Sequence, residues 1–168
     1  GMSAGNIYRF FASKLDIAEA MARQFNADLY QAMSEIARSN DAPAKRLRRV
    51  FHYSLSQTFD AIEREAKILE VAEVLGEERP LFMNEGLAQE RIYLCTILED
   101  GVEQGHFAPI ADPNYTAEMI QSALMKYRFP QLFSRLTLPK LRRELNGVLD
   151  IIIAGLQKGI EKTPETEH

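Results

Sequence analysis

The residues best suited to contact nucleic acid stand in the first fourteen positions of this 168-residue chain. Tyr8, Arg9 and Lys14 follow the small or polar residues 3–6. Small residues at a helix start allow close approach to a groove, and Asn6 has the amide needed to bind an adenine edge. A lysine in the first turn of a helix is disfavoured by the helix dipole, unless an external anion such as a DNA phosphate lies nearby. The segment therefore predicts contacts with DNA phosphates and bases.

The charge distribution agrees with this prediction. The net charge of the whole chain is −4, but residues 1–49 carry eight Lys or Arg and five Asp or Glu, a net charge of +3. The other 119 residues carry a net charge of −7. A basic start on an acidic body orients a protein towards phosphate, although an ordinary solvated surface also explains so small an excess.

Signals of catalysis are weak. The histidines are His52, His106 and His168, and the sequence has no His-Glu-x-x-His, Gly-rich phosphate loop or nucleophile elbow. The single cysteine, Cys95, excludes an internal disulfide and a zinc site built mainly from thiolates. We expect no metal and no cofactor, and a helical enzyme is the least favoured class.

The chain also lacks signals of membrane insertion or export. Its longest apolar runs, such as Leu149–Leu156, are too short to span a bilayer. Residues 1–14 have no apolar stretch followed by a small-residue cleavage site. We therefore expect a cytoplasmic protein that does not contact the membrane.

Apolar residues recur at spacings of three and four throughout, which predicts an all-α fold. We expect a short helix over Ser3–Phe11, then a capping box from Ser13 to Asp16 that starts a long helix ending near residues 39–41. The further expected helices are Ala42–Glu65, Ala66–Leu75, Arg79–Gly105, one from Asp112 or Asn114 through Tyr127, and one from Pro139 through Ile160. Whether Ala66–Leu75 continues the helix before it stays open.

The last expected helix is apolar on more than one face, because Val148, Leu149 and the run 151–153 cannot all face one neighbour. Such a helix is either central in a monomer or shared with a second chain, and we expect a two-fold dimer. The predicted interface residues are Met119, Ala123, Tyr127, Leu145, Val148, Leu149, Ile152 and Leu156.

The opening segment resembles the end of the helix-turn-helix of the TetR (tetracycline repressor-like) family. In that family a short recognition helix carries an Ile/Leu–Tyr pair, an aromatic residue follows three positions later, and Ser-Lys opens the next helix. Here these residues are Ile7, Tyr8, Phe11, Ser13 and Lys14. The resemblance covers about 20 residues, and the length and helix succession of the rest agree with it.

The resemblance implies that Tyr8 and Lys14 contact phosphates of a DNA operator, whereas Ser3, Gly5, Asn6 and Arg9 face bases or backbone. Phe10 departs from the family, in which many relatives have histidine, so no phosphate contact is assigned to it. Roughly 30 residues that relatives place before Ser3 are not in this sequence, including the first helix of the motif. We therefore expect specific DNA binding to be impaired in this truncated chain.

The resemblance further implies a pocket for a small apolar or aromatic effector and a homodimer. The expected lining residues are Phe51, His52, Leu55, Phe59, Phe82, Met83, Tyr93 and Met125, although plain core packing explains each of them as well. The expected organisation is a remnant of the DNA-binding head in residues 1–40, an effector-binding and dimerisation domain in 41–162, and a disordered tail in 163–168. The alternative is a stand-alone ligand-binding and dimerisation module without DNA binding.

Overall fold

The computed structural model describes residues 4–130 and 136–159, with side chains from residue 14 onward. Within these ranges the chain forms six α-helices and one short 3-10 helix, so the all-α prediction is confirmed. The elements are α1 (Ala4–Ala37), α2 (Pro43–Arg64), α3 (Lys67–Glu78), α4 (Pro80–Glu103), α5 (Pro113–Ala123), η1 (Met125–Tyr127) and α7 (Leu138–Lys158). Ser3 and the predicted tail, residues 163–168, lie outside the described residues.

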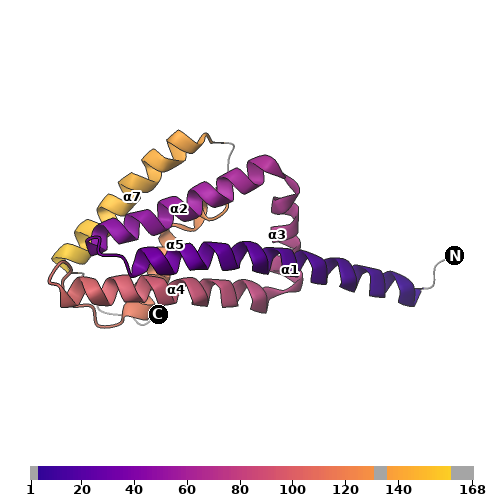
Figure 1. Ribbon diagram of the computed structural model, residues 1–168, viewed down its shortest axis with the longest axis horizontal. Coiled ribbons are helices and arrows are strands. Elements are labelled where there is room, and N and C mark those ends of the chain that lie inside the picture. The colour runs from indigo at the N-terminus through magenta and orange to yellow at the C-terminus, as the bar shows by residue number, and fades with distance from the viewer. Residues whose placement is uncertain (1–3, 131–135, 160–168) are drawn as a thin grey trace, which may run out of the picture.

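Helix α1 is the long axis of the molecule, and its N-terminal part extends beyond the other helices (Figure 1). Its second half packs against α2 and α4, and α3 crosses from the end of α2 to the start of α4. Helix α5 packs against α4, and α7 packs along α2. The first turns of α1 project from the body, and behind them α1 is tied to it by the ion pairs of Asp16 and Glu19 with Arg79, between α3 and α4.

The prediction of two helices separated at Ser13 is wrong, because α1 is continuous from Ala4 to Ala37. An N-cap residue needs non-helical backbone angles, and the Ser13–Asp16 pair does not impose them here. Residues 6–37 contain neither glycine nor proline, so the intrinsic helix propensity of this stretch opposes a break.

Other helix ends follow local chemistry. Pro43 and Pro80 open α2 and α4, where the missing N–H has no intrahelical partner to lose. Asp112 caps α5 by accepting a hydrogen bond from the Tyr115 backbone N–H at 2.9 Å, which decides between the two starts, Asp112 and Asn114, that the sequence left open. Helix α3 is separate from α2, which settles the question left open by the sequence, and it ends at Glu78 rather than at residue 75.

Helix α4 ends in a Schellman motif. The His106 N–H donates to the Gly101 carbonyl oxygen at 2.8 Å, and the Gly105 N–H donates to the Val102 carbonyl oxygen at 3.0 Å. Gly105 has a φ of +72°, which a residue without Cβ adopts at no steric cost. The chain then turns back, and Phe107 packs directly over Gly101.

The hydrophobic core lies where α1, α2, α4, α5 and α7 meet. From α1 it receives the second half of an apolar stripe, Leu29, Met33 and Ile36, whereas Met21 in the first half is 70% exposed. Helix α7 contributes residues at steps of four and three, namely Leu141, Leu145, Leu149, Ile153 and Leu156. The core therefore contains residues from both sides of the domain boundary expected near residue 40, since α1 lies before it and the other helices lie after it.

Candidate functional site

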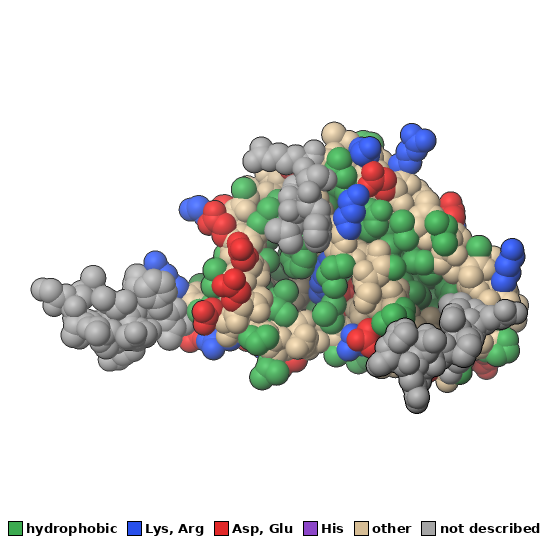
Figure 2. Space-filling view, turned by 180° about the vertical axis from the view of Figure 1, so that it is seen from behind, with side chains coloured by type: hydrophobic (Ala, Val, Ile, Leu, Met, Phe, Trp, Pro, Cys, Tyr) green, Lys and Arg blue, Asp and Glu red, His purple; other side chains and the backbone are tan. Residues whose placement is uncertain are grey.

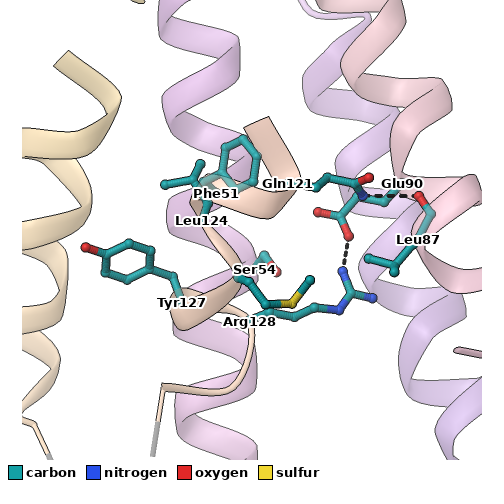
Figure 3. A pocket seen from close by; sticks show the side chains of 9 residues that line it. Phe51, Ser54, Leu87, Glu90, Gln121, Leu124, Tyr127 and Arg128 are labelled. Carbon is teal, nitrogen blue, oxygen red and sulfur yellow. Dashed lines mark hydrogen bonds and ion pairs between the residues drawn. The ribbon is translucent and has the colours of Figure 1, made fainter. Parts of the chain in front are cut away.

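A cavity bordered by polar side chains lies between α2, α4, α5 and η1 (Figure 3). Its lining residues are Phe51, Ser54, Leu87, Glu90, Gln121, Leu124, Met125, Tyr127 and Arg128. The cavity encloses about 330 Å³ including its opening to solvent, but its packed side chains leave room for only about one water molecule. The lining combines apolar and polar side chains, as small-molecule sites do. The small free volume indicates that the site is nearly closed in this conformation.

Glu90 and Arg128 form an ion pair at the edge of this cavity, and their side chains point toward each other in Figure 3. Glu90 stands in the middle of α4 on its inner face, between Leu87 and Leu94. Arg128 follows directly after η1. Because burying a carboxylate is costly without a partner, the guanidinium is what makes Glu90 tolerable in this position.

Gln121 on α5 completes a hydrogen-bond network beside the ion pair. Its Nε2 donates to the Leu87 carbonyl oxygen at 3.1 Å, and its Oε1 accepts from Arg91 Nη1 at 3.1 Å. Gln121 is buried, so these two bonds satisfy an amide that would otherwise lose its contacts with water. They also fix α5 against α4 at the level of the cavity.

Tyr30 connects α1 to the same part of α4. Its hydroxyl donates to the Gly86 carbonyl oxygen at 3.1 Å. A Cβ added at Gly86 would lie 2.9 Å from this hydroxyl, so the hydroxyl would have to move, whereas its distance of 3.7 Å from Arg128 Nη2 is an ordinary van der Waals contact. Burial raises the pKa of the Tyr30 hydroxyl above its usual value, and the nearby positive charge of Arg128 partly offsets the rise.

The side of the cavity opposite the ion pair is apolar and comes from Phe51 on α2 and from Leu124, whereas Leu87 lies beside Glu90 (Figure 3). Phe51 and Leu124 are core residues that remain in contact with the cavity. Tyr127 points away from the ion pair (Figure 3). No group of His, Cys, Asp or Glu able to hold a metal ion occurs among the described residues. The arrangement can bind a small molecule that has an apolar body and a polar group.

The structure places two of the predicted lining residues, Phe51 and Met125, at this cavity. The others lie elsewhere. Leu55 is fully buried in the core, His52 Nε2 contacts Asn146 Oδ1 at 2.7 Å on the side facing α7, and Phe59 packs against the core.

The remaining three predicted lining residues belong to α4. Phe82 is buried under the Arg23 guanidinium, 4.8 Å from the ring centre. Tyr93 lines a second, more open groove between α1 and α4, where its hydroxyl accepts a hydrogen bond from Gln89 at 2.9 Å. Met83 is half-buried in the first turn of α4 and does not line the cavity.

The polar residues of the site, Glu90, Gln121 and Arg128, are absent from the set that sequence reasoning selected. The spacing of Glu90 could have indicated its burial, because it follows Leu87 by three residues and precedes Leu94 by four and so shares their helix face. Gln121 likewise follows Ala117 by four residues, and both are buried. A charged or amide residue within an apolar stripe indicates a buried polar cluster.

The predicted DNA-contacting residues occupy the projecting end of α1. Lys14 is exposed there, and the backbone of Gly5, Asn6, Tyr8 and Arg9 is helical. Ser3 lies outside the described residues. The position of Lys14 is compatible with the predicted contact to phosphate, which stays a prediction.

The predicted dimer residues divide into two groups. Tyr127, Leu145, Leu149 and Leu156 are buried in the core of this chain, so in this conformation they have no surface to present to another copy. Leu145, Leu149 and Leu156 belong to the stripe of α7 that packs into the core of the same chain. Met119 and Ala123 on α5 are exposed, whereas Val148 and Ile152 on α7 are half-buried.

The face opposite to that of Figure 1 has hydrophobic side chains spread over its middle (Figure 2). Ile151, which was not among the predicted interface residues, is 75% exposed on α7. A contiguous exposed apolar patch is typical of contacts with other chains, whereas a single exposed apolar residue is common on any protein surface. None of the described helices is long and apolar enough to cross a membrane.

Comparison with known proteins agrees with the fold. The chain is 27% identical over 126 residues to the HTH-type transcriptional repressor KstR2 from two strains of Mycobacterium tuberculosis, CDC 1551 / Oshkosh and ATCC 25618 / H37Rv. These alignments cover 72% of this chain and 61% of each relative, so the chain spans about three-fifths of the length of the curated relatives it matches.

A solved structure, that of the ketosteroid transcriptional regulator KstR2 of Mycobacterium tuberculosis, shares the fold. Its TM-score is 0.59 at 23% identity, over 95% of this chain and 81% of that one. Residues 43–149, which include the whole lining of the cavity, match the family described as the tetracyclin repressor-like, C-terminal domain. The chain therefore belongs to the tetracyclin repressor-like family and contains its C-terminal domain.

Proposed function

We propose that this chain is the effector-sensing part of a TetR-type transcriptional repressor. Its C-terminal domain binds a small, largely apolar or aromatic effector in the cavity next to Glu90 and Arg128. The observation that carries the proposal is the position of this polar cluster inside the segment that matches the family, residues 43–149. A regulator needs an effector that binds two conformations with different affinity, and a nearly closed cavity satisfies this need because opening it changes the packing of α4 and α5.

DNA binding is assigned to the projecting end of α1. Lys14 is exposed there, at the end of a helix that extends beyond the body (Figure 1). The basic excess of residues 1–49 lies in the same part of the sequence. The proposed division is the one expected from the sequence, with a DNA-facing segment up to about residue 40, the sensing domain in 41–162 and a tail beyond it.

The dimer interface is proposed on the outer faces of α5 and α7. Exposed or half-buried apolar residues remain there after the core is complete, namely Met119, Ala123, Val148, Ile151 and Ile152. Two copies joined by a two-fold axis bury the same residues on both chains. In this arrangement each operator half-site would face one copy of α1.

The experiment is fluorescence anisotropy with a labelled duplex from the intergenic DNA beside the gene and a scrambled duplex of equal length. We expect a preference for the intergenic duplex that weakens steeply with salt. A Lys14→Gln variant should weaken binding to both duplexes and lower the salt slope by about one, as loss of one phosphate contact predicts. The matched control is Lys158→Gln, at the other end of the molecule, which should leave both quantities unchanged.

A second candidate is a stand-alone ligand-binding and dimerisation module without DNA binding. This candidate is compatible with the match of residues 43–149 to the family's C-terminal domain, which contains the whole lining of the cavity. Equal affinity for the two duplexes across the salt range would support this candidate over the repressor. The cytoplasm is the expected location for either function.

A further inference from the structure

The two members of the Glu90–Arg128 ion pair differ in how easily each can leave it. The Glu90 side chain is 6% exposed, and its backbone is held within α4. The Arg128 side chain is 19% exposed and belongs to the short segment after η1, at the edge of the helical body. A guanidinium at this edge can turn into water, whereas a carboxylate in the middle of a packed helix cannot.

This difference determines which kind of ligand group can enter the pair. An anion bound to Arg128 would leave Glu90 buried without a partner, which is the costly outcome. A cation bound to Glu90 would leave Arg128 free to be solvated. Replacing the Arg128 guanidinium at Glu90 by a cationic group of the ligand therefore costs less than binding an anion at Arg128.

We propose that the cavity takes a ligand with an apolar or aromatic body and one positively charged group with N–H donors, such as an amidinium or an amine. This group replaces the Arg128 guanidinium at Glu90. The inference rests on the proposed effector site and adds the chemical class of its ligand.

The other lining residues suit the same ligand. Phe51, Leu87 and Leu124 supply the apolar wall for its body. Gln121 uses its Nε2 and its Oε1 in hydrogen bonds to Leu87 and Arg91, so Glu90 is the charged acceptor in the lining, alongside the neutral hydroxyls of Ser54 and Tyr127. Once displaced, Arg128 no longer stands beside Gly86 and Tyr30, so the exchange changes the contact between α4 and α1.

The test uses three aromatic probes of similar size: benzamidine, which is cationic, benzamide, which is neutral, and benzoate, which is anionic. Binding of each probe to the full 168-residue chain is measured by isothermal titration calorimetry and by the shift that the probe causes in the melting temperature of the chain. Arg128→Ala vacates the exchangeable position, Glu90→Gln removes the acceptor charge, and Glu99→Gln is the matched control at an exposed position of the same helix.

We expect the wild-type chain to prefer benzamidine over both other probes. The Arg128→Ala chain should bind benzamidine at least about tenfold more tightly than the wild type, and benzamidine should restore its melting temperature. Glu90→Gln should abolish the preference, and Glu99→Gln should retain it. Should Glu90→Gln fail to fold, the comparison of benzamidine with benzamide on the Arg128→Ala chain decides the matter.

Tighter binding of benzoate, lost in Arg128→Ala, would overturn the proposal and identify an anion site. Equal binding of the three probes would also overturn it, since the cavity would then select by shape alone. The probe-binding measurements are made without DNA, so they are independent of the DNA-binding assay. If the probes fail to bind as expected but DNA binding is sequence-selective, the ligand class is refuted and the repressor function stands. If benzamidine binds as expected but DNA binding is not sequence-selective, the repressor function is refuted and the ligand class stands.

Discussion

The Tyr30 hydroxyl on α1 occupies the space that a side chain at Gly86 on α4 would need, and it donates a hydrogen bond to the carbonyl oxygen of the same glycine. This contact joins the helix that projects toward the proposed DNA site to the helix that carries Glu90. The absence of a Cβ at one residue thus determines how closely α1 and α4 approach at this level.

We expect Gly86→Ala to displace the Tyr30 hydroxyl, because the new Cβ would lie 2.9 Å from it. Loss of the hydrogen bond should lower the free energy of unfolding by about 1 kcal/mol, measured by urea denaturation. In a Tyr30→Phe background the added methyl meets no hydroxyl, so Gly86→Ala should cost less there. Equal costs in the two backgrounds would show that the clash involves other atoms.

The pH dependence of stability should include a contribution from Tyr30. Its folded-state pKa is raised by burial, so above pH 10 the unfolded chain loses the hydroxyl proton before the folded chain does. The contribution is therefore complete below pH 10 and decreases as the pH rises further. Denaturation at pH 8 and at pH 10.5 should show that the stability advantage of the wild type over Tyr30→Phe shrinks at the higher pH. An advantage that stays constant or grows would contradict the raised pKa.

The buried Arg46 should be important for stability. Its Nη1 donates to the Ala37 carbonyl oxygen at 2.5 Å and to Asp100 Oδ2 at 2.6 Å, so it joins the ends of α1 and α4. Arg46→Met should destabilise the fold by about 2–3 kcal/mol, the lower part of the range for a broken buried pair, since Asp100 is partly solvated. The control, Arg49→Met, removes an exposed pair with Asp41 and should cost much less than Arg46→Met.

The packing of Phe107 over Gly101 makes a further prediction about stability. A Cβ at Gly101 would lie 2.1 Å from Phe107 Cδ2, so Gly101→Ala must move the ring and should destabilise the fold by about 1–3 kcal/mol. Gly147→Ala is the matched control, because Gly147 is also helical and its Cβ would meet open space. That change should stabilise the chain by about 0.5–1 kcal/mol through helix propensity. Similar melting temperatures for the two variants would argue against the packing described.

The proposed dimer can be tested at Ile151. A charge at this exposed position of α7 should separate two copies without disturbing the core, so Ile151→Glu should convert a dimer into a monomer in light scattering. Ile92→Glu places the same charge at an exposed position of α4 and should leave the mass unchanged. A dimer that persists in Ile151→Glu, but not in Ile92→Glu, would move the interface to α4.

Local signals in the sequence predicted much of the fold. The prolines that open α2 and α4 and the Asp112 cap act within one helical turn, so they can be interpreted without knowing the tertiary structure. The Ser13 capping box is also local, but it competes with a continuous helix of strong formers, and that balance is not set by the motif alone. The helix expected to run through Tyr127 ends at Ala123 and continues as η1, a change that no strong turn residue marks.

The candidate site was harder to predict because it depends on which polar residues turn inward. Phe51 and Met125 could be selected because aromatic and soft side chains are common in pockets. Glu90 and Arg128 are 38 residues apart, and a charged residue in a helix is usually on a solvated face. Their pairing follows from the packing of α5 against α4, which brings the segment after η1 to Glu90, and this is a property of the assembled helices.

The unbroken course of α1 has a mechanical consequence. The ion pair of Asp16 with Arg79 at 2.7 Å ties α1 to the body, and from there to Ala4 the helix is an arm about 18 Å long, since each residue adds about 1.5 Å. A tilt of about 10° at this ion pair would move the far end by about 3 Å, roughly the spacing of one base pair. A small change in the packing of Arg79 would thus become a larger displacement at the tip of the arm.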